Sequence, residues 1–150
     1  MNKKGFTLVE VLAVIVLLGL LVGIAVPNIL RSQTKAKEKT LSTKVKNIER
    51  AAVLWGQDNK AEVLEGPSCT GTFKTNSNCE KATIINVEKL ITSNYIKADD
   101  DTNIKNPVSN ENMNGCTITV YTKYGKIYAT YDKTSNSTCW VKWWIKKDLH

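Results

Sequence analysis

The chain contains 150 residues, carries a formal net charge of +7 at pH 7, and has four cysteines and a single histidine. That histidine is the last residue, His150, and there is no glycine-rich phosphate loop, so the sequence offers no Cys-His or Ser-His-Asp arrangement. We therefore expect a protein that is not an enzyme and needs no cofactor, with one small soluble domain beside an N-terminal segment.

A long apolar run follows a short basic start at the N-terminus. Lys3 and Lys4 precede Gly5, and in residues 6–30 the only ionisable side chain is that of Glu10. About 20 apolar residues are enough to cross a bilayer, so residues 6–30 are predicted to form a transmembrane helix. A single carboxylate inside such a segment indicates a functional residue.

The sequence KKGFTLVE, residues 3–10, closely resembles the prepilin motif of type IV pilins and of the pseudopilins of type II secretion and competence systems. The resemblance implies a leader, residues 1–5, which a membrane-embedded prepilin peptidase removes by cutting between Gly5 and Phe6. It also implies that the new N-terminal residue, Phe6, is N-methylated. The charged residues of the leader are Lys3 and Lys4.

The spacing of Phe6 and Glu10 points to a role in subunit assembly. Residues i and i+4 share a helix face, so after cleavage Glu10 can lie near the free amine of its own Phe6 or of an adjacent subunit. An unpaired carboxylate in hydrocarbon costs several kcal/mol, so a neighbouring subunit that supplies an amine is favoured over lipid alone. The simpler interpretation of Glu10 is its favourable interaction with the helix macrodipole, about 0.3–1 kcal/mol.

A secretory signal peptide and a plain membrane anchor are the other interpretations of this segment. Gly23-Ile24-Ala25 imitates a signal-peptide cleavage site, but the apolar run is long for a signal peptide and has an acid near its start. A plain anchor rarely needs an acid at that depth. Counting basic residues favours a cytoplasmic C-terminal side, whereas the resemblance and the cysteines favour an exterior one, which we adopt.

Residues 31–59 are predicted to continue the helix with a single apolar stripe, since no turn signal precedes Gly56. Gly19 and Pro27 fall where pilins often carry helix irregularities, and Pro27 lacks a backbone donor, so we expect a kink or local loosening there. An all-round apolar half must be covered by lipid or by other copies, whereas a striped half needs a sheet on one face only. The stripe consists of Leu30, Thr34, Leu41, Val45, Ile48, Ala52 and Trp55.

Basic residues crowd the second half of the predicted helix. Such a run is most simply a solvated face, with subunit contacts, lipid headgroups and attraction to nucleic acid as alternatives. No motif supports nucleic-acid binding. The residues are Arg31, Lys35, Lys37, Lys39, Lys44, Lys46 and Arg50, interrupted by Glu38 and Glu49.

The head, residues 60–150, is predicted to combine loops with a small antiparallel sheet. Residues 66–79 form a loop, and residues 87–96 form a short helix or turn whose Leu90, Ile91 and Tyr95 pack inward. Alternating side chains predict three antiparallel strands, at residues 117–122, 127–131 and 139–145.

Three consecutive acids, Asp99, Asp100 and Asp101, raise the question of a calcium site in the head. The ligand spacing of a DxDxDG loop is missing, so a solvated turn is the better interpretation. We expect no metal.

The four cysteines contain no CxxC pair, which disfavours a zinc ribbon or a redox centre and favours disulfide bonds. Three connectivities are open. We favour Cys69 with Cys79 and Cys116 with Cys139, because each pair closes a locally plausible unit. Four buried free thiols in a reducing compartment are the alternative.

These features predict an α+β fold of the type IV pilin kind, in which a long N-terminal helix packs its second half on a small antiparallel sheet. The function expected from the resemblance is that of a structural subunit, a major pilin of a type IV pilus that serves adhesion, twitching motility or related surface functions. A pseudopilin of a secretion or DNA-uptake system and a monomeric membrane-anchored binding domain are the alternatives.

The partners implied by the resemblance are further copies of the chain, the prepilin peptidase, an assembly ATPase and a platform protein of the inner membrane. The expected location is the cytoplasmic membrane before assembly and an extracellular filament afterwards.

Overall fold

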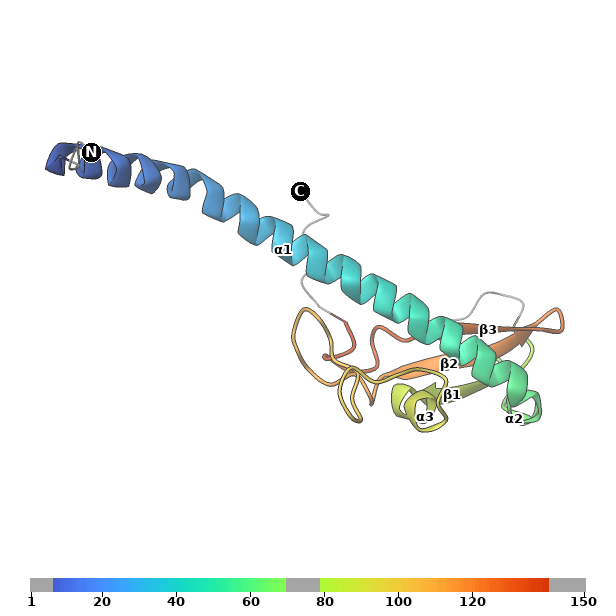
Figure 1. Ribbon diagram of the computed structural model, residues 1–150. Helices are drawn as coiled ribbons and strands as arrows, with labels where there is room; N and C mark the ends of the chain where they lie inside the picture. The colour runs from blue at the N-terminus through green and yellow to red at the C-terminus, as the bar shows by residue number, and fades with distance from the viewer. Residues whose placement is uncertain (1–6, 70–78, 141–150) are drawn as a thin grey trace. The chain divides into compact units, whose positions relative to one another are not determined.

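The computed structural model describes residues 7–69 and 79–140, and it leaves out the side chains of residues 23–28 and 30. The chain divides into two compact units, residues 1–37 and 38–150, which are described separately. The predicted division into residues 1–5, 6–30, 31–59 and 60–150 stays a prediction. The elements in chain order are α1 (Leu8–Asp58), α2 (Lys60–Glu65), β1 (Ala82–Asn86), α3 (Val87–Thr92), β2 (Thr117–Lys123) and β3 (Lys126–Tyr131), as Figure 1 shows.

In the first unit, α1 begins at Leu8 and runs as a continuous helix through Gly19 and Pro27. Its described apolar side chains are all open to the surroundings, with exposed fractions from 49% at Val14 to 82% at Leu8. Among the residues that the structure describes, no helix combines the length and apolarity needed to cross a membrane.

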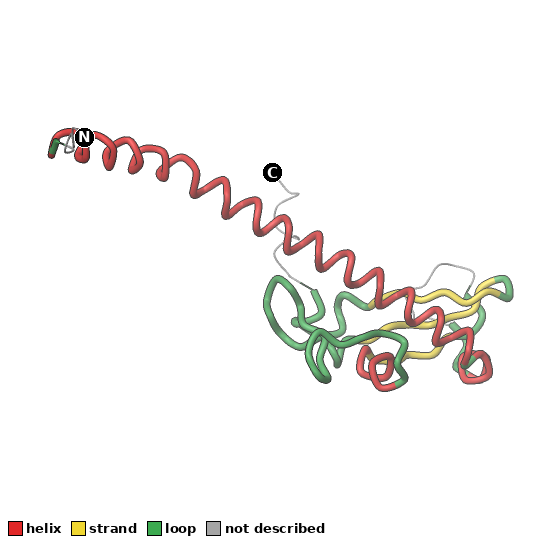
Figure 2. Tube along the Cα trace, in the orientation of Figure 1, coloured by secondary structure: helices red, strands yellow, loops and turns green. Residues whose placement is uncertain are grey.

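In the second unit, the last part of α1 packs on the sheet through the predicted apolar stripe (Figure 2). Gly56 marks the closest approach, since a Cβ atom there would lie 2.7 Å from Val120 Cγ1 and 2.9 Å from Ile127 Cγ2. Thr34 is exposed, so the buried stripe starts later than predicted. Its buried residues are Leu41, Val45, Ile48, Ala51, Ala52 and Trp55.

The sheet has the strand order β1-β2-β3, and both neighbouring pairs are antiparallel. The predicted strands at residues 117–122 and 127–131 are confirmed as β2 and β3. They are joined by a two-residue turn, Tyr124 and Gly125, whose positive φ angles of 52° and 71° suit the right-handed twist of a hairpin. Along each strand, side chains alternate between the face toward α1 and the outer face, because successive residues of a strand point to opposite sides.

The predicted third strand is wrong where the structure describes it. Cys139 and Trp140 lie in a turn and a bend, and residues 141–145 are outside the described residues. The third strand is instead β1, which the sequence analysis missed. Its β-branched run, Thr83 to Ile85, was the available signal, and it pairs in register from Ala82 opposite Tyr121 to Asn86 opposite Thr117.

Two short helices lie on either side of β1 in the sequence: α2 precedes it and α3 follows it. The long helix ends at Asp58 and α2 follows, so helix continues beyond the predicted end at residue 59. The predicted short helix after β1 is confirmed as α3, and its N-cap Asn86 accepts a hydrogen bond from the amide of Lys89 at 2.9 Å. As expected, Leu90 is buried, and Ile91 and Tyr95 pack against the core.

Two disulfides close the loops of the head, Cys69–Cys79 and Cys116–Cys139, the pairs favoured from the sequence. Both Cys116 and Cys139 are fully buried in the core. Their bond ties the start of β2 to the segment after β3 across 23 residues. Closing a loop of that length contributes about 3 kcal/mol, because it restricts the unfolded chain.

We expect Gly56→Ala to lower the free energy of unfolding by about 1–3 kcal/mol, because the added methyl group must displace Val120 and Ile127. Helix propensity alone predicts the opposite sign, since alanine is about 1 kcal/mol better than glycine in a helix. The matched control is Gly115→Ala, where a Cβ atom meets nothing within 4 Å. Urea unfolding of wild type and of the two variants measures the free energies of unfolding. A Gly56→Ala variant as stable as the Gly115→Ala variant would contradict the close packing of α1 on the sheet.

Candidate functional site

The start of α1 carries a reciprocal cap made by Thr7 and Glu10. The amide and the hydroxyl of Thr7 each donate a hydrogen bond to Glu10 Oε2 at 2.9 Å, and the amide of Glu10 donates to Thr7 Oγ1 at 3.3 Å. This is the capping box of a helix N-terminus. The sequence analysis missed it, although the Thr-x-x-Glu spacing was readable in TLVE.

The cap gives Glu10 a local structural task besides the assembly role expected from the sequence. Its carboxylate lies on an exposed first turn, and one of its oxygens, Oε2, accepts both hydrogen bonds from Thr7. A glutamine accepts the same hydrogen bonds at this position of a capping box but carries no charge. The two tasks of Glu10 can therefore be separated by mutation. The other predicted residues of the motif, Lys3, Lys4, Gly5 and Phe6, lie outside the described residues.

Residues 8–22 of the first unit present an apolar surface to their surroundings, with Glu10 as the only ionisable side chain among them. At Gly19 a Cβ atom would meet nothing within 4 Å, so the chain itself leaves that position open. A contiguous apolar patch of this kind marks an interaction surface, because single soluble chains rarely expose one. Its most exposed members are Leu8, Val9, Leu17, Leu20, Leu21 and Val22.

In the head, the predicted acidic turn is held by lysines. Lys44 Nζ of α1 lies 2.5 Å from Asp99 Oδ2 and donates to the carbonyl oxygen of Lys105 at 2.8 Å. Partial burial tends to raise the pKa of Asp99, but hydrogen bonds from the Lys44 ammonium and the Lys105 amide outweigh it and hold the pKa below its usual value. Lys44 thus supplies the positive charge at this turn.

The side chain of Asp100 accepts hydrogen bonds from backbone and side chain within the same turn. Lys105 Nζ lies 3.0 Å from Asp100 Oδ2, and the amides of Thr102 and Asn103 donate to Asp100 Oδ1. These hydrogen bonds, that of Lys105 first, lower the pKa of Asp100 to about 2. Within the described part of the chain, no group of three or more histidines, cysteines or acids is arranged to hold a metal ion.

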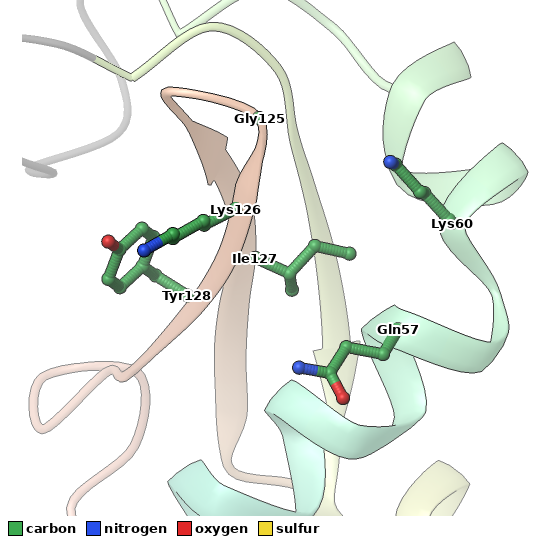
Figure 3. Close-up of a pocket in the computed structure, with 6 residues that line it drawn as sticks. All are labelled: Gln57, Lys60, Gly125, Lys126, Ile127 and Tyr128. Carbon is green, nitrogen blue, oxygen red and sulfur yellow. The ribbon is translucent and has the colours of Figure 1, made fainter.

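Two surface grooves lie along one side of α1 and offer binding rather than catalysis. One, of about 420 Å³, is lined by α1 alone. The other, of about 450 Å³, lies between the end of α1, the start of α2 and the β2–β3 hairpin, with Lys60 and Lys126 on opposite walls (Figure 3). Neither groove holds a histidine or a pair of carboxylates among its lining residues. The lining residues are Lys46, Glu49, Arg50, Val53 and Leu54 in the first, and Gln57, Lys60, Gly125, Lys126, Ile127 and Tyr128 in the second.

Comparison with known families finds one match, at the N-terminus. Residues 1–26 match the family described as the prokaryotic N-terminal methylation motif. This match covers the predicted cleavage site and the apolar run as far as residue 26. No solved structure gives a significant match to the chain.

Curated relatives match over part of their length. The type II secretion system core protein G of Vibrio cholerae is 40% identical over 58 residues, which is 39% of this chain and 40% of that protein. The protein of the same name from Aeromonas hydrophila is 37% identical over 58 residues, 39% of this chain and 41% of that protein. The type IV major pilin protein PilA of Myxococcus xanthus is 35% identical over 50 residues, 33% of this chain and 23% of that protein. The chain therefore spans about two fifths or less of the curated relatives it matches.

We expect Lys44→Met to loosen the acidic turn and to lower the free energy of unfolding at pH 7 by about 0.5–1 kcal/mol, since the pair is partly open to solvent. Because the pKa of Asp99 is lowered in the folded state, its contribution is present above the usual aspartate pKa of about 4 and is lost as the pH falls through its folded value. The difference from wild type should therefore shrink below pH 4.

Denaturant unfolding at pH 7 and at pH 2.5 measures this effect, with Lys39→Met as the control on an exposed turn of the same helix. A Lys44→Met variant that loses as much stability at pH 2.5 as at pH 7 would show that Lys44 acts through its hydrogen bond to the carbonyl oxygen of Lys105 and not through its ion pair with Asp99.

Proposed function

We propose that this chain, a type IV pilin-like protein by its N-terminal motif and its relatives, is a pseudopilin subunit of a secretion-type machine. Two relatives that are 40% and 37% identical over 58 residues are named type II secretion system core protein G, which supports the pseudopilin over the major pilin first expected from the sequence. In this proposal the prepilin peptidase removes residues 1–5, and mature chains polymerise through their N-terminal helices.

The observation that carries the proposal is the apolar surface of the first unit with its single carboxylate. Described apolar side chains from Leu8 to Val22 are about half or more exposed, and Glu10 is the only charged group among them. Burying such side chains releases about 25 cal/mol per Å² of apolar surface. Packing against other copies of the same helix supplies that burial, and a neighbouring amine supplies a counter-charge for Glu10.

The membrane stage of the proposal rests on the sequence. Residues 6–30 carry one ionisable side chain, and the resemblance places the leader in the cytoplasm. Before assembly the chain is anchored in the cytoplasmic membrane. After assembly it forms a filament outside that membrane, extended by an assembly ATPase and a platform protein.

A major pilin of a surface filament is the second candidate. It is supported by the match to the Myxococcus xanthus major pilin, over a smaller share of both proteins than the secretion relatives. The two candidates share processing and polymerisation and differ in where the filament ends. Adhesion and motility belong to the second candidate only.

The first test compares filaments from cells that carry wild-type protein, Glu10→Gln or Thr7→Ala. Wild-type filaments should contain a chain that starts at Phe6, methylated or not, as intact mass and N-terminal sequencing report. Glu10→Gln keeps the cap of α1 and removes the charge, so we expect filament protein to fall at least about tenfold. Thr7→Ala weakens the cap and keeps the charge, so we expect a loss of about twofold or less.

Both variants must be processed and present in the membrane at the wild-type level for the comparison to count. A mature chain that starts elsewhere than Phe6, or wild-type protein found only as a monomer, would remove the basis for a filament subunit. A Glu10→Gln variant that loses no more than about twofold in filament protein would show that assembly does not need the charge of Glu10, which would leave this residue with helix capping alone.

A further inference from the structure

The last part of α1, which belongs to the second unit, has a face with basic residues around an apolar centre. Lys46, Arg50, Val53 and Leu54 recur at helical spacing and line the groove of about 420 Å³; we call these four residues the basic groove. Leu54 is 53% exposed although it is a large apolar residue. About half of Leu54 is therefore open to a partner, and the groove offers apolar area framed by two cations.

Glu49 also lines this groove and offsets one of its two positive charges, so the lining keeps one excess positive charge. Glu49 Oε1 accepts a hydrogen bond at 3.0 Å from the amide of Tyr131, which ends the edge strand β3. The carboxylate is therefore turned toward the sheet and serves the backbone. Two further lysines, Lys60 and Lys126, belong to the lining of the second groove, and in Figure 3 the side chain of Lys126 points away from Lys60.

The short helices α2 and α3, which the ion pair between Glu62 and Lys89 joins, carry exposed acids and another exposed leucine. Glu62, Leu64 and Glu65 of α2 and Glu88 of α3 are all exposed; we call these four residues the acidic end. Leu64 is 46% exposed, whereas its neighbour Val63 is fully buried and anchors α2 to the core. The acidic end is thus a fixed surface and not a loose loop.

A lysine at the acidic end is already used within the chain. Lys89 Nζ lies 2.6 Å from Glu62 Oε1 and 4.6 Å from the centre of the Trp55 ring. Its ammonium is therefore held against the core of its own domain. Glu65 and Glu88 remain as the excess negative charge that a partner meets.

We propose that the basic groove of one copy receives the acidic end of a second copy, with Leu54 and Leu64 in contact at the centre. The two surfaces are complementary in charge and each has an apolar centre, which is what a specific contact between copies requires. They are also different patches on one chain. A heterologous contact of this kind continues from copy to copy and builds an open helical filament when its rotation does not close a ring.

This inference rests on the proposed function and adds the contact between heads. The chain's own residues 141–150 are the other occupant to consider. They include Lys142, Lys146 and Lys147 and a single acid, Asp148, so their charge has the same sign as that of the groove. Charge therefore favours the second copy.

Disulfide crosslinking in filament-forming cells tests the contact. A chain with both Leu54→Cys and Leu64→Cys should give a ladder of covalent multimers under mild oxidation. A mixture of chains with one substitution each should stop at dimers, and either single variant alone should give none. Dimers from Leu54→Cys alone would show a two-fold contact and overturn the proposal.

Charge reversal provides the second test. Lys46→Glu with Arg50→Glu should lower filament protein at least about tenfold, and Glu65→Lys with Glu88→Lys should do the same, because like charges then face each other. All four changes in one chain should restore filaments to within about twofold of wild type. Reversal of Lys35 and Lys37 to glutamate, on exposed turns outside the groove, is the matched control.

The outcomes separate the contact from the function. Wild-type filaments that start at Phe6, together with no Leu54–Leu64 crosslink and no rescue by the fourfold variant, would overturn the head contact and leave the filament subunit standing. No filaments from the wild type would overturn the proposed function itself. A variant with both Leu54→Cys and Trp144→Cys provides the comparison with the chain's own C-terminal residues. A crosslink within one chain of that variant would assign the groove to residues 141–150. Unfolding curves of the purified variants, equal to wild type, exclude loss of the fold as the cause.

Discussion

The packing of α1 on the inner face of the sheet is the contact on which the head depends. It is possible because position 56 carries no side chain, so the helix backbone comes within van der Waals reach of Val120 and Ile127. Trp55 beside it is 2% exposed and supplies the largest buried side chain. The chain gives up helix propensity at Gly56 and gains close packing between two elements that lie far apart in the sequence.

Charges finish what this packing leaves open. Three side chains extend from helices to other parts of the fold: Lys44 reaches the acidic turn, Glu49 reaches the end of the edge strand, and Lys89 reaches α2. Each contact is individually worth little, because it is partly open to water. Together they tie the loops and strands to the helices. Of the seven basic residues between Arg31 and Arg50, Lys44 alone is partly buried, and the other six are exposed as a solvated face.

The N-terminal unit meets a different constraint, because its side chains are apolar and its surroundings must cover them. The capping box of Thr7 and Glu10 satisfies the first amides of the helix within the chain, so α1 can begin without a partner. The charge of Glu10 is not neutralised by that arrangement, and this remaining charge is what assembly can exploit. Local structure and assembly therefore draw on the same side chain in different ways.

The sequence by itself determined the features that depend on neighbours along the chain. The prepilin motif at residues 3–10, most of the apolar stripe that ends at Trp55, and the strands at residues 117–122 and 127–131 were predicted because motifs and periodicity are local properties. Tertiary structure decided what pairs across space. The third strand is β1 and not residues 139–140 of the predicted strand. Strand pairing depends on the register with β2 and on which side chains face α1, and both are set by contacts between distant residues. Tertiary structure also placed Lys44 on Asp99, 55 residues away, a pairing that no local pattern in the sequence encodes.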